Sequence, residues 1–216
     1  MSVIDQFLAI LAPHECLGCH AEGDLLCPDC IVRLAVVPER CYHCFEPSAG
    51  ARTCAGCRAA SNLHQVLAGT SYGGVAKELV ARLKFSGAQQ AARQMAARMS
   101  PLVRAAGIQA VIVPVPTATA RVRGRGFDQA VLLARELSRR TRLPYLDCLA
   151  RSGHTRQLGM SRRRRLSQLE NAFRVTGTPI SRGTSILLVD DVITTGATLE
   201  AAAKTLRQNG AGRIDA

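Results

Sequence analysis

Residues 186–199 read Ile-Leu-Leu-Val-Asp-Asp-Val-Ile-Thr-Thr-Gly-Ala-Thr-Leu, and this stretch decides the fold. Its first four residues are apolar and branched, which is typical of a strand buried in a parallel sheet. Two acids, Asp190 and Asp191, end this strand. A turn rich in Thr and Gly follows, and residues 199–206 then read as a helix. Because free N–H groups and the helix dipole attract phosphate, the junction predicts a site for a sugar phosphate.

The same residues also have a simpler explanation. Asp and Thr are common helix caps, so an ordinary strand–turn–helix would carry some of them. Capping needs one such residue, whereas this junction has five. Carboxylates accept hydrogen bonds from sugar hydroxyls, so Asp190 and Asp191 are predicted to hold the sugar. The residues predicted to bind the phosphate are Thr194, Thr195, Gly196, Ala197 and Thr198.

Strand and helix patterns alternate through most of the chain. Strands are expected at 70–72, 110–114, within 143–149 and at 186–189, and helices at 75–85, 91–99, 128–137 and 199–206. Asp128 is expected to cap the helix that follows it. Such alternation predicts an α/β fold with a mostly parallel sheet, whose ligands bind at the carboxyl ends of the strands.

Composition points to anionic partners without identifying them. The 216 residues carry a net charge of +12, which favours phosphates or nucleic acid. Of the 28 basic residues only Lys77, Lys84 and Lys204 are lysines, so a compositional bias toward Arg remains an alternative. Trp is absent and aromatic residues make up 4%, which leaves few rings for stacking on bases.

Residues 1–13 lack the basic start and the apolar run of a secretory signal. No segment approaches the roughly 20 apolar residues of a membrane span. The sequence therefore predicts a cytoplasmic protein without membrane insertion.

Eight of the nine cysteines form four Cys-x-x-Cys pairs within residues 16–57. Two such pairs complete a tetrahedral zinc site, so two structural zinc ions are expected. Pairing of consecutive knuckles is preferred because it closes shorter loops, and a cross-braced arrangement, iron–sulfur ligation and disulfides are the alternatives. The predicted ligands are Cys16, Cys19, Cys27 and Cys30 for one ion, and Cys41, Cys44, Cys54 and Cys57 for the other. This pattern predicts a zinc-ribbon module at 1–62 and a second domain at 63–216.

Two arginine-rich segments are candidates for contact with pyrophosphate or a nucleic-acid backbone. The first follows the strand at 110–114, and the second lies in a polar segment at 151–165 that is expected to be a loop. A solvated surface is the alternative for the second segment. The residues concerned are Arg121, Arg123, Arg125, Arg162, Arg163, Arg164 and Arg165.

The chain as a whole resembles the ComF (competence protein F, GntX-like) family. The resemblance rests on the four Cys-x-x-Cys pairs and on five further segments in the same order: Tyr72–Phe85, Pro114–Pro116, Arg125–Gln129, Asn171–Phe173 and Val189–Thr198. It implies a double zinc ribbon followed by a type I phosphoribosyltransferase-like domain. The family normally continues beyond Ala216 into a final strand.

The resemblance also implies a ligand and a role. The ligand is 5-phosphoribosyl-1-pyrophosphate (PRPP) with Mg²⁺, held by Asp190 and Asp191, which would stabilise positive charge at the anomeric carbon during catalysis. The role is DNA uptake and natural transformation, with handling of single-stranded DNA beside a helicase-like partner. An active Mg²⁺-dependent phosphoribosyltransferase with an unspecified acceptor is the alternative, although no hood over a nucleobase and no general base stand out. A third reading makes the ribbon a docking platform for a protein partner.

Overall fold

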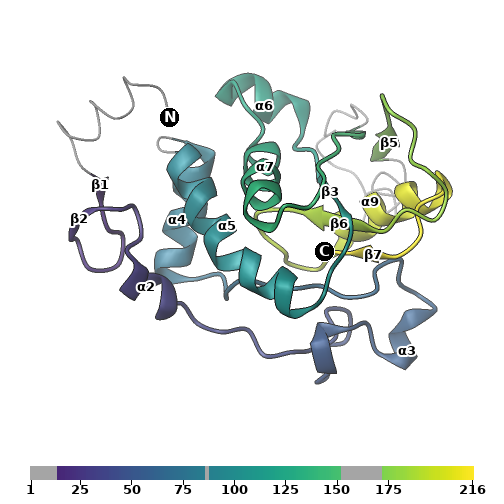
Figure 1. The fold of residues 1–216 in the computed structure, drawn as a ribbon, viewed down its shortest axis with the longest axis horizontal. Helices are drawn as coiled ribbons and strands as arrows, with labels where there is room; N and C mark the ends of the chain where they lie inside the picture. The colour runs from purple at the N-terminus through teal and green to yellow at the C-terminus, as the bar shows by residue number, and fades with distance from the viewer. Residues whose placement is uncertain (1–13, 86–87, 152–171) are drawn as a thin grey trace, which may run out of the picture.

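The computed structural model of the chain describes residues 14–85, 88–151 and 172–216 (Figure 1). Its helices are α2 (Pro28–Val32), α3 (Ala55–Arg58), α4 (Gly74–Lys84), α5 (Ala88–Ala105), α6 (Thr119–Arg125), α7 (Gln129–Thr141) and α9 (Ala197–Gln208). Its strands are β1 (His14–Glu15), β2 (Glu22–Gly23), β3 (Val111–Pro114), β4 (Leu149–Arg151), β5 (Phe173–Val175), β6 (Ile186–Val189) and β7 (Ile214–Asp215).

The central sheet is parallel, with the strand order β3-β6-β7. Pro114 pairs with Val189 at the carboxyl ends of β3 and β6, and Ile186 pairs with Ile214 of β7. Beyond β7 the chain near Gln65 continues the sheet by one parallel bridge to Asp215. The expected α/β fold with a parallel sheet is therefore confirmed.

Both faces of the sheet are buried. Side chains along a strand alternate between the two faces, so neighbouring residues of β6 pack on opposite sides. Leu187 and Val189 of β6 pack in a cluster with Leu133 and Leu137 of α7. Ile186 and Leu188 pack in a second cluster that contains Leu199 and Leu206 of α9. The sheet thus lies between a layer of helices α5 and α7 and the helix α9 (Figure 1).

The cysteine-rich segment does not gather in one place. Figure 1 shows β1, β2 and α2 beside α4 and α5, whereas α3 lies at the far end of an extended stretch of chain that runs along the lower edge of the molecule. Cys16 and Cys30 belong to a hydrophobic cluster with Leu79 and Leu83 of α4. Tyr42 belongs instead to the cluster on the α9 face of the sheet. The two halves of the segment therefore pack against different hydrophobic cores.

The structure corrects several local predictions. Residues 70–72 form an irregular stretch with bends at 70 and 72 instead of a strand, and the arginines expected in a loop at 121–125 lie on the helix α6. The strand expected within 143–149 forms only at its end, in β4, although Tyr145 makes a bridge to Ile112. The short strand β7 was not expected. Of the arginine-rich segment at 151–165, only residue 151 is described.

Within the ranges that the structure describes, no helix is both long and apolar enough to cross a membrane.

Candidate functional site

The twin acids stand where the sequence predicts, directly after β6. The carboxylate of Asp190 accepts a hydrogen bond from the backbone N–H of Asp191 at 2.8 Å. Burial raises the pKa of Asp190, and the neighbouring charge of Asp191 raises it further, to about 8. Two carboxylates in so confined a place repel each other, so the pair favours a cation or a hydrogen-bond donor as its ligand.

Lys84, the last residue of α4, completes this acidic pair. Its Nζ lies 2.7 Å from Oδ2 of Asp191, and the Asp191 side chain is only 8% exposed. The positive charge of Lys84 also acts to lower the pKa of Asp190. Sequence reasoning did not assign this residue to the site. The available signal was that Lys84 is one of three lysines in a chain whose other basic residues are all arginines.

The turn after the acids leads into α9 through Gly196. This glycine has φ 75°, in the left-handed region that favours glycine, and it is the N-cap of the helix. A Cβ on Gly196 would lie 2.9 Å from two ring carbons of Tyr42, so the position excludes a side chain as well. Thr194 and Thr195 are exposed, and the first-turn amides of α9 have no acceptor within the helix itself. The loop thus presents hydroxyl and amide donors together.

The first arginine-rich segment emerges from the same edge of the sheet. Because β3 and β6 are parallel neighbours, the chain after Pro114 leaves the sheet beside the chain after Val189. Arg121 and Arg123 are exposed on α6, while the Arg125 guanidinium lies 5.5 Å from the ring centre of Phe85.

Asp128 connects the chain before α6 to the start of α7. As predicted, it caps α7, with the N–H of Ala130 donating to its carboxylate at 2.9 Å. It also accepts hydrogen bonds from the backbone N–H and the hydroxyl of Thr117, at 2.8 and 3.0 Å.

A cavity of about 450 Å³ lies beside the acids. Asp190, Asp191 and Thr194 line one wall, and Met95 and Met99 of α5 line another. The cysteine-rich segment supplies further lining residues between Leu34 and Phe45. The lining is largely apolar, and its charged residues are Glu39, Arg40, Arg98, Asp190 and Asp191. No hood segment was evident in the sequence, and in the structure the chain from the second cysteine knuckle through the third lines part of the cavity.

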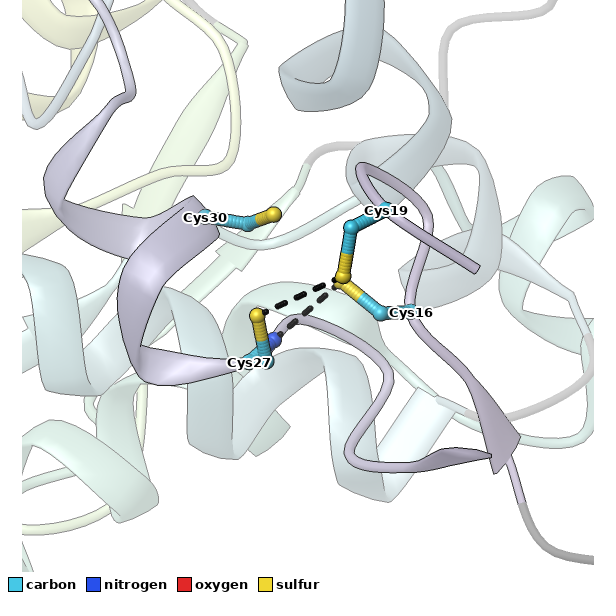
Figure 2. A group of neighbouring side chains, drawn as sticks. All are labelled: Cys16, Cys19, Cys27 and Cys30. Carbon is cyan, nitrogen blue, oxygen red and sulfur yellow. Dashed lines mark hydrogen bonds between the residues drawn. The ribbon is translucent and has the colours of Figure 1, made fainter. Parts of the chain in front are cut away.

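The eight knuckle cysteines form two groups of four, paired consecutively: Cys16, Cys19, Cys27 and Cys30, and Cys41, Cys44, Cys54 and Cys57. These are called cluster 1 and cluster 2 below. Within each cluster the sulfurs lie within 4.8 Å of one another, and Figure 2 shows the four side chains of cluster 1 directed toward a common centre. All nine cysteines are free thiols. Consecutive pairing is confirmed, and the cross-braced and disulfide arrangements are not seen.

The sulfur spacing fits zinc. Metal–sulfur bonds of about 2.3 Å in a tetrahedron put neighbouring sulfurs about 3.8 Å apart. The Sγ atoms of Cys19 and Cys27 are 3.7 Å apart, and those of Cys44 and Cys54 are also 3.7 Å apart. Each cluster offers four sulfur ligands, so protein would fill every tetrahedral position around an ion, as in structural zinc sites.

Backbone amides prepare the first cysteine of each cluster to act as a thiolate. Burial alone would raise the pKa of Cys16, but the N–H groups of Cys27, Cys19 and Gly18 outweigh it and lower the pKa to about 6. Burial and backbone amides act in the same way on Cys41, whose pKa also falls to about 6. The N–H of Cys27 lies 3.3 Å from the sulfur of Cys16 (Figure 2).

The two clusters repeat one local structure. In each, the third cysteine is the N-cap of a short helix, α2 after Cys27 and α3 after Cys54. The residue after the second cysteine has a positive φ in both, 62° at His20 and 64° at Phe45.

Comparison with known proteins agrees with this geometry. Residues 122–216 match the phosphoribosyl transferase domain family. Over 218 residues the chain is 32% identical to competence protein F of Haemophilus influenzae, and the match covers 93% of each protein. The chain belongs to the competence protein F family. It contains the double cysteine cluster and the phosphoribosyl transferase domain that this family was expected to combine.

Two other relatives of the family match over a shorter length. Competence protein ComFC of Bacillus subtilis is 32% identical over 142 residues, which is 65% of this chain and 57% of that protein. DNA utilization protein YhgH of Escherichia coli K12 is 35% identical over 144 residues, which is 63% of each protein.

The structure brings some predicted site residues together and leaves others undescribed. Asp190, Asp191 and Thr194 share the wall of one cavity, and Thr195 to Thr198 continue from it into α9. Arg121, Arg123 and Arg125 lie on α6, in the chain that leaves the same edge of the sheet after β3. Arg162, Arg163, Arg164 and Arg165 lie outside the described residues.

Proposed function

We propose that this chain binds a phosphoribosyl ligand of the PRPP type, with Mg²⁺, at the carboxyl end of β6. The observation that carries the proposal is the sequence of groups along one short path: two half-buried acids, a loop of exposed hydroxyls and the N-terminus of α9. The acids suit a ribose and a hydrated Mg²⁺, which takes only one or two protein carboxylates. The loop suits the 5-phosphate.

Calorimetry with PRPP and Mg²⁺ tests this site. The wild-type chain should release heat, and Asp191→Asn should weaken binding about 10- to 100-fold, because a charged hydrogen bond contributes roughly 1.5–3 kcal/mol. The exposed residue Asp147 provides a matched control, since Asp147→Asn removes the same charge from another part of the surface. Absence of heat from the wild-type chain, where a known transferase binds, would refute the proposal.

We further propose that the protein acts in DNA uptake and handles single-stranded DNA in the cytoplasm. The names of the relatives, competence and DNA utilization proteins, support the process. The exposed Arg121 and Arg123, on the helix that follows β3, support contact with a phosphate backbone. Free thiols in place of disulfides fit a reducing compartment.

The DNA proposal predicts strong salt dependence. Anisotropy of a labelled oligo-dT strand should show affinity falling steeply between 50 and 200 mM salt, since about 0.7 counterions are released for each phosphate that a single strand contacts. Replacing Arg121, Arg123 and Arg125 with Ser should flatten the salt slope by about 2, from the same relation. Replacing the four arginines at 162–165 with Ser tests the second segment. Equal affinity at both salt concentrations would contradict the proposal.

An active transferase is the alternative, and the cavity favours it. In such a reaction the bond between the anomeric carbon and pyrophosphate breaks, and an acceptor atom bonds to that carbon and gives up a proton. The apolar cavity beside Asp190 would hold a flat acceptor in place. Release of pyrophosphate that depends on an added acceptor would support turnover, and tight PRPP binding with no release for any nucleobase tried would favour the scaffold role.

A further inference from the structure

Glu200, in the first turn of α9, is bound by donors from the chain that follows cluster 2. Its carboxylate accepts hydrogen bonds from the hydroxyl of Ser61 at 2.6 Å and from the side-chain amide of Asn62 at 2.9 Å. The backbone N–H of Asn62 also donates to it, at 3.0 Å, and so does the hydroxyl of Tyr42. Burial alone would raise the pKa of Glu200, but these donors outweigh burial and lower it.

Tyr42 connects this network directly to cluster 2. It follows the ligand Cys41 in the chain and precedes the ligand Cys44 by two residues. Its ring is buried, and two of its carbons lie 2.9 Å from the point where a Cβ on Gly196 would stand. One side chain of the metal knuckle therefore contacts both the N-cap of α9 and the carboxylate one turn further along.

The position of Glu200 makes the network relevant to the loop. An acid in the first turn usually serves its own helix, by interacting with the dipole and the free amides. Here the donors to the carboxylate belong to residues 42, 61 and 62, all outside the helix. The start of α9 is consequently anchored from outside the helix, while the amides at its N-terminus remain directed toward the phosphate loop.

Cluster 1 makes a useful contrast because its contacts lie elsewhere. Cys16 and Cys30 pack with Leu79 and Leu83 of α4 and with Ala92 of α5. Tyr42, in contrast, packs in the core that contains Leu199 of α9.

We propose that cluster 2 positions the phosphate loop through Tyr42 and Glu200, so that the affinity for a phosphoribosyl ligand depends on whether cluster 2 holds its metal. Tyr42 and Glu200 are positioning residues, since they act on the loop and not on the ligand. The identity of the ligand rests on the proposed function, whereas the coupling between cluster 2 and α9 does not.

Hydrogen exchange at the amides of residues 200–203, the first in α9 that are hydrogen-bonded within the helix, tests the coupling in the zinc-loaded full chain. Tyr42→Phe removes one charge-assisted hydrogen bond, so it should speed exchange of these amides about tenfold and lower PRPP–Mg²⁺ affinity by about the same factor. Glu200→Gln removes the charge that four donors share, so its effect should be at least as large. The control is Gln208→Ala, at the exposed far end of α9, which should change neither. Unchanged exchange in both Tyr42→Phe and Glu200→Gln would overturn the proposal.

The dependence on metal is tested with two matched ligand variants. Cys44 and Cys19 are exposed ligands at the same position of clusters 2 and 1. With zinc counted by native mass spectrometry, Cys44→Ser should speed exchange at residues 200–203, and Cys19→Ser should not. Adding Glu200→Gln to Cys44→Ser should have little further effect, because both changes break one path. Equal effects of the two cysteine variants, or full additivity, would overturn the coupling.

The two proposals fail in different ways. If the wild-type chain binds no PRPP but the exchange differences appear, the coupling stands and the proposed ligand is wrong. If PRPP binds and exchange is the same in every variant, the ligand stands and the coupling is wrong.

Discussion

Gly196→Ala is the substitution whose cost the structure defines most closely. The residue has φ 75°, so an alanine there must adopt the left-handed conformation. Its new methyl group would also lie 2.9 Å from Cδ2 and Cε2 of Tyr42, closer than carbon atoms approach in folded proteins. Tyr42 has little freedom to move away, because its ring is buried and its hydroxyl is bound to Ser61 and Glu200.

Two contributions add up to the expected loss of stability. The left-handed conformation costs an alanine about 1–2 kcal/mol. Forcing a methyl group into filled space costs about 1–3 kcal/mol more. Gly183 distinguishes the backbone cost from the steric cost, since it has φ 81° and no atom within 4 Å of the point where a Cβ would stand. Gly183→Ala should therefore lose only the first amount, and Gly196→Ala about 2–5 kcal/mol in total.

Urea unfolding in zinc-containing buffer, followed by circular dichroism, measures both variants against the wild-type chain. The free energy of unfolding of Gly196→Ala should lie below that of Gly183→Ala by at least about 1 kcal/mol, and its Tm should be lower by at least about 2–4 °C. Equal losses in the two variants would show that Tyr42 does not hold the loop, and would refute the packing described for the N-cap of α9.

Three further predictions concern the metals and the acids. Native mass spectrometry should find two zinc ions per chain, and Cys16→Ser or Cys41→Ser should each lower the count to one, because three thiolates bind a structural zinc more weakly. The pKa of Asp190 is raised from its ordinary 3.8 to about 8, so between these pH values the folded chain binds more protons than the unfolded chain. The free energy of unfolding of the ligand-free chain should therefore fall as pH rises from about 4 to 8. Asp190→Asn should flatten this pH dependence in urea titrations. Lys84→Met removes a charge that lowers the pKa of Asp190, so the midpoint of the Asp190 carboxyl titration by NMR should move to higher pH.

The parts of the fold that the sequence predicted are those with a local cause. The strand at 186–189 could be predicted because all four of its side chains are buried and therefore apolar, and α9 could be predicted because it buries one apolar face. Asp128 could be predicted as a cap because a cap acts on the next few residues. The cysteine pairing followed from loop closure, which again favours neighbours in the chain.

The parts that the sequence did not predict depend on contacts between distant residues or on very short elements. Lys84 and Asp191 are more than 100 residues apart, and nothing in either local pattern indicates that they pair. The contact of Tyr42 with Glu200 spans 158 residues. β7 has two residues, too few for a periodic pattern. The segment of α6 was read as a loop because Gly124 and three arginines among its seven residues hide any apolar face.

Together these distant contacts explain how a segment with so little apolar surface of its own serves the site. Cluster 1 packs against α4, and α4 ends in Lys84, which pairs with Asp191. Cluster 2 contains Tyr42, which contacts Gly196 and Glu200 at the start of α9. Cluster 1 is therefore connected to the acids of the predicted site, and cluster 2 to its phosphate loop. Since each cluster packs on a different core, loss of one metal should loosen one half of the site and leave the other half ordered.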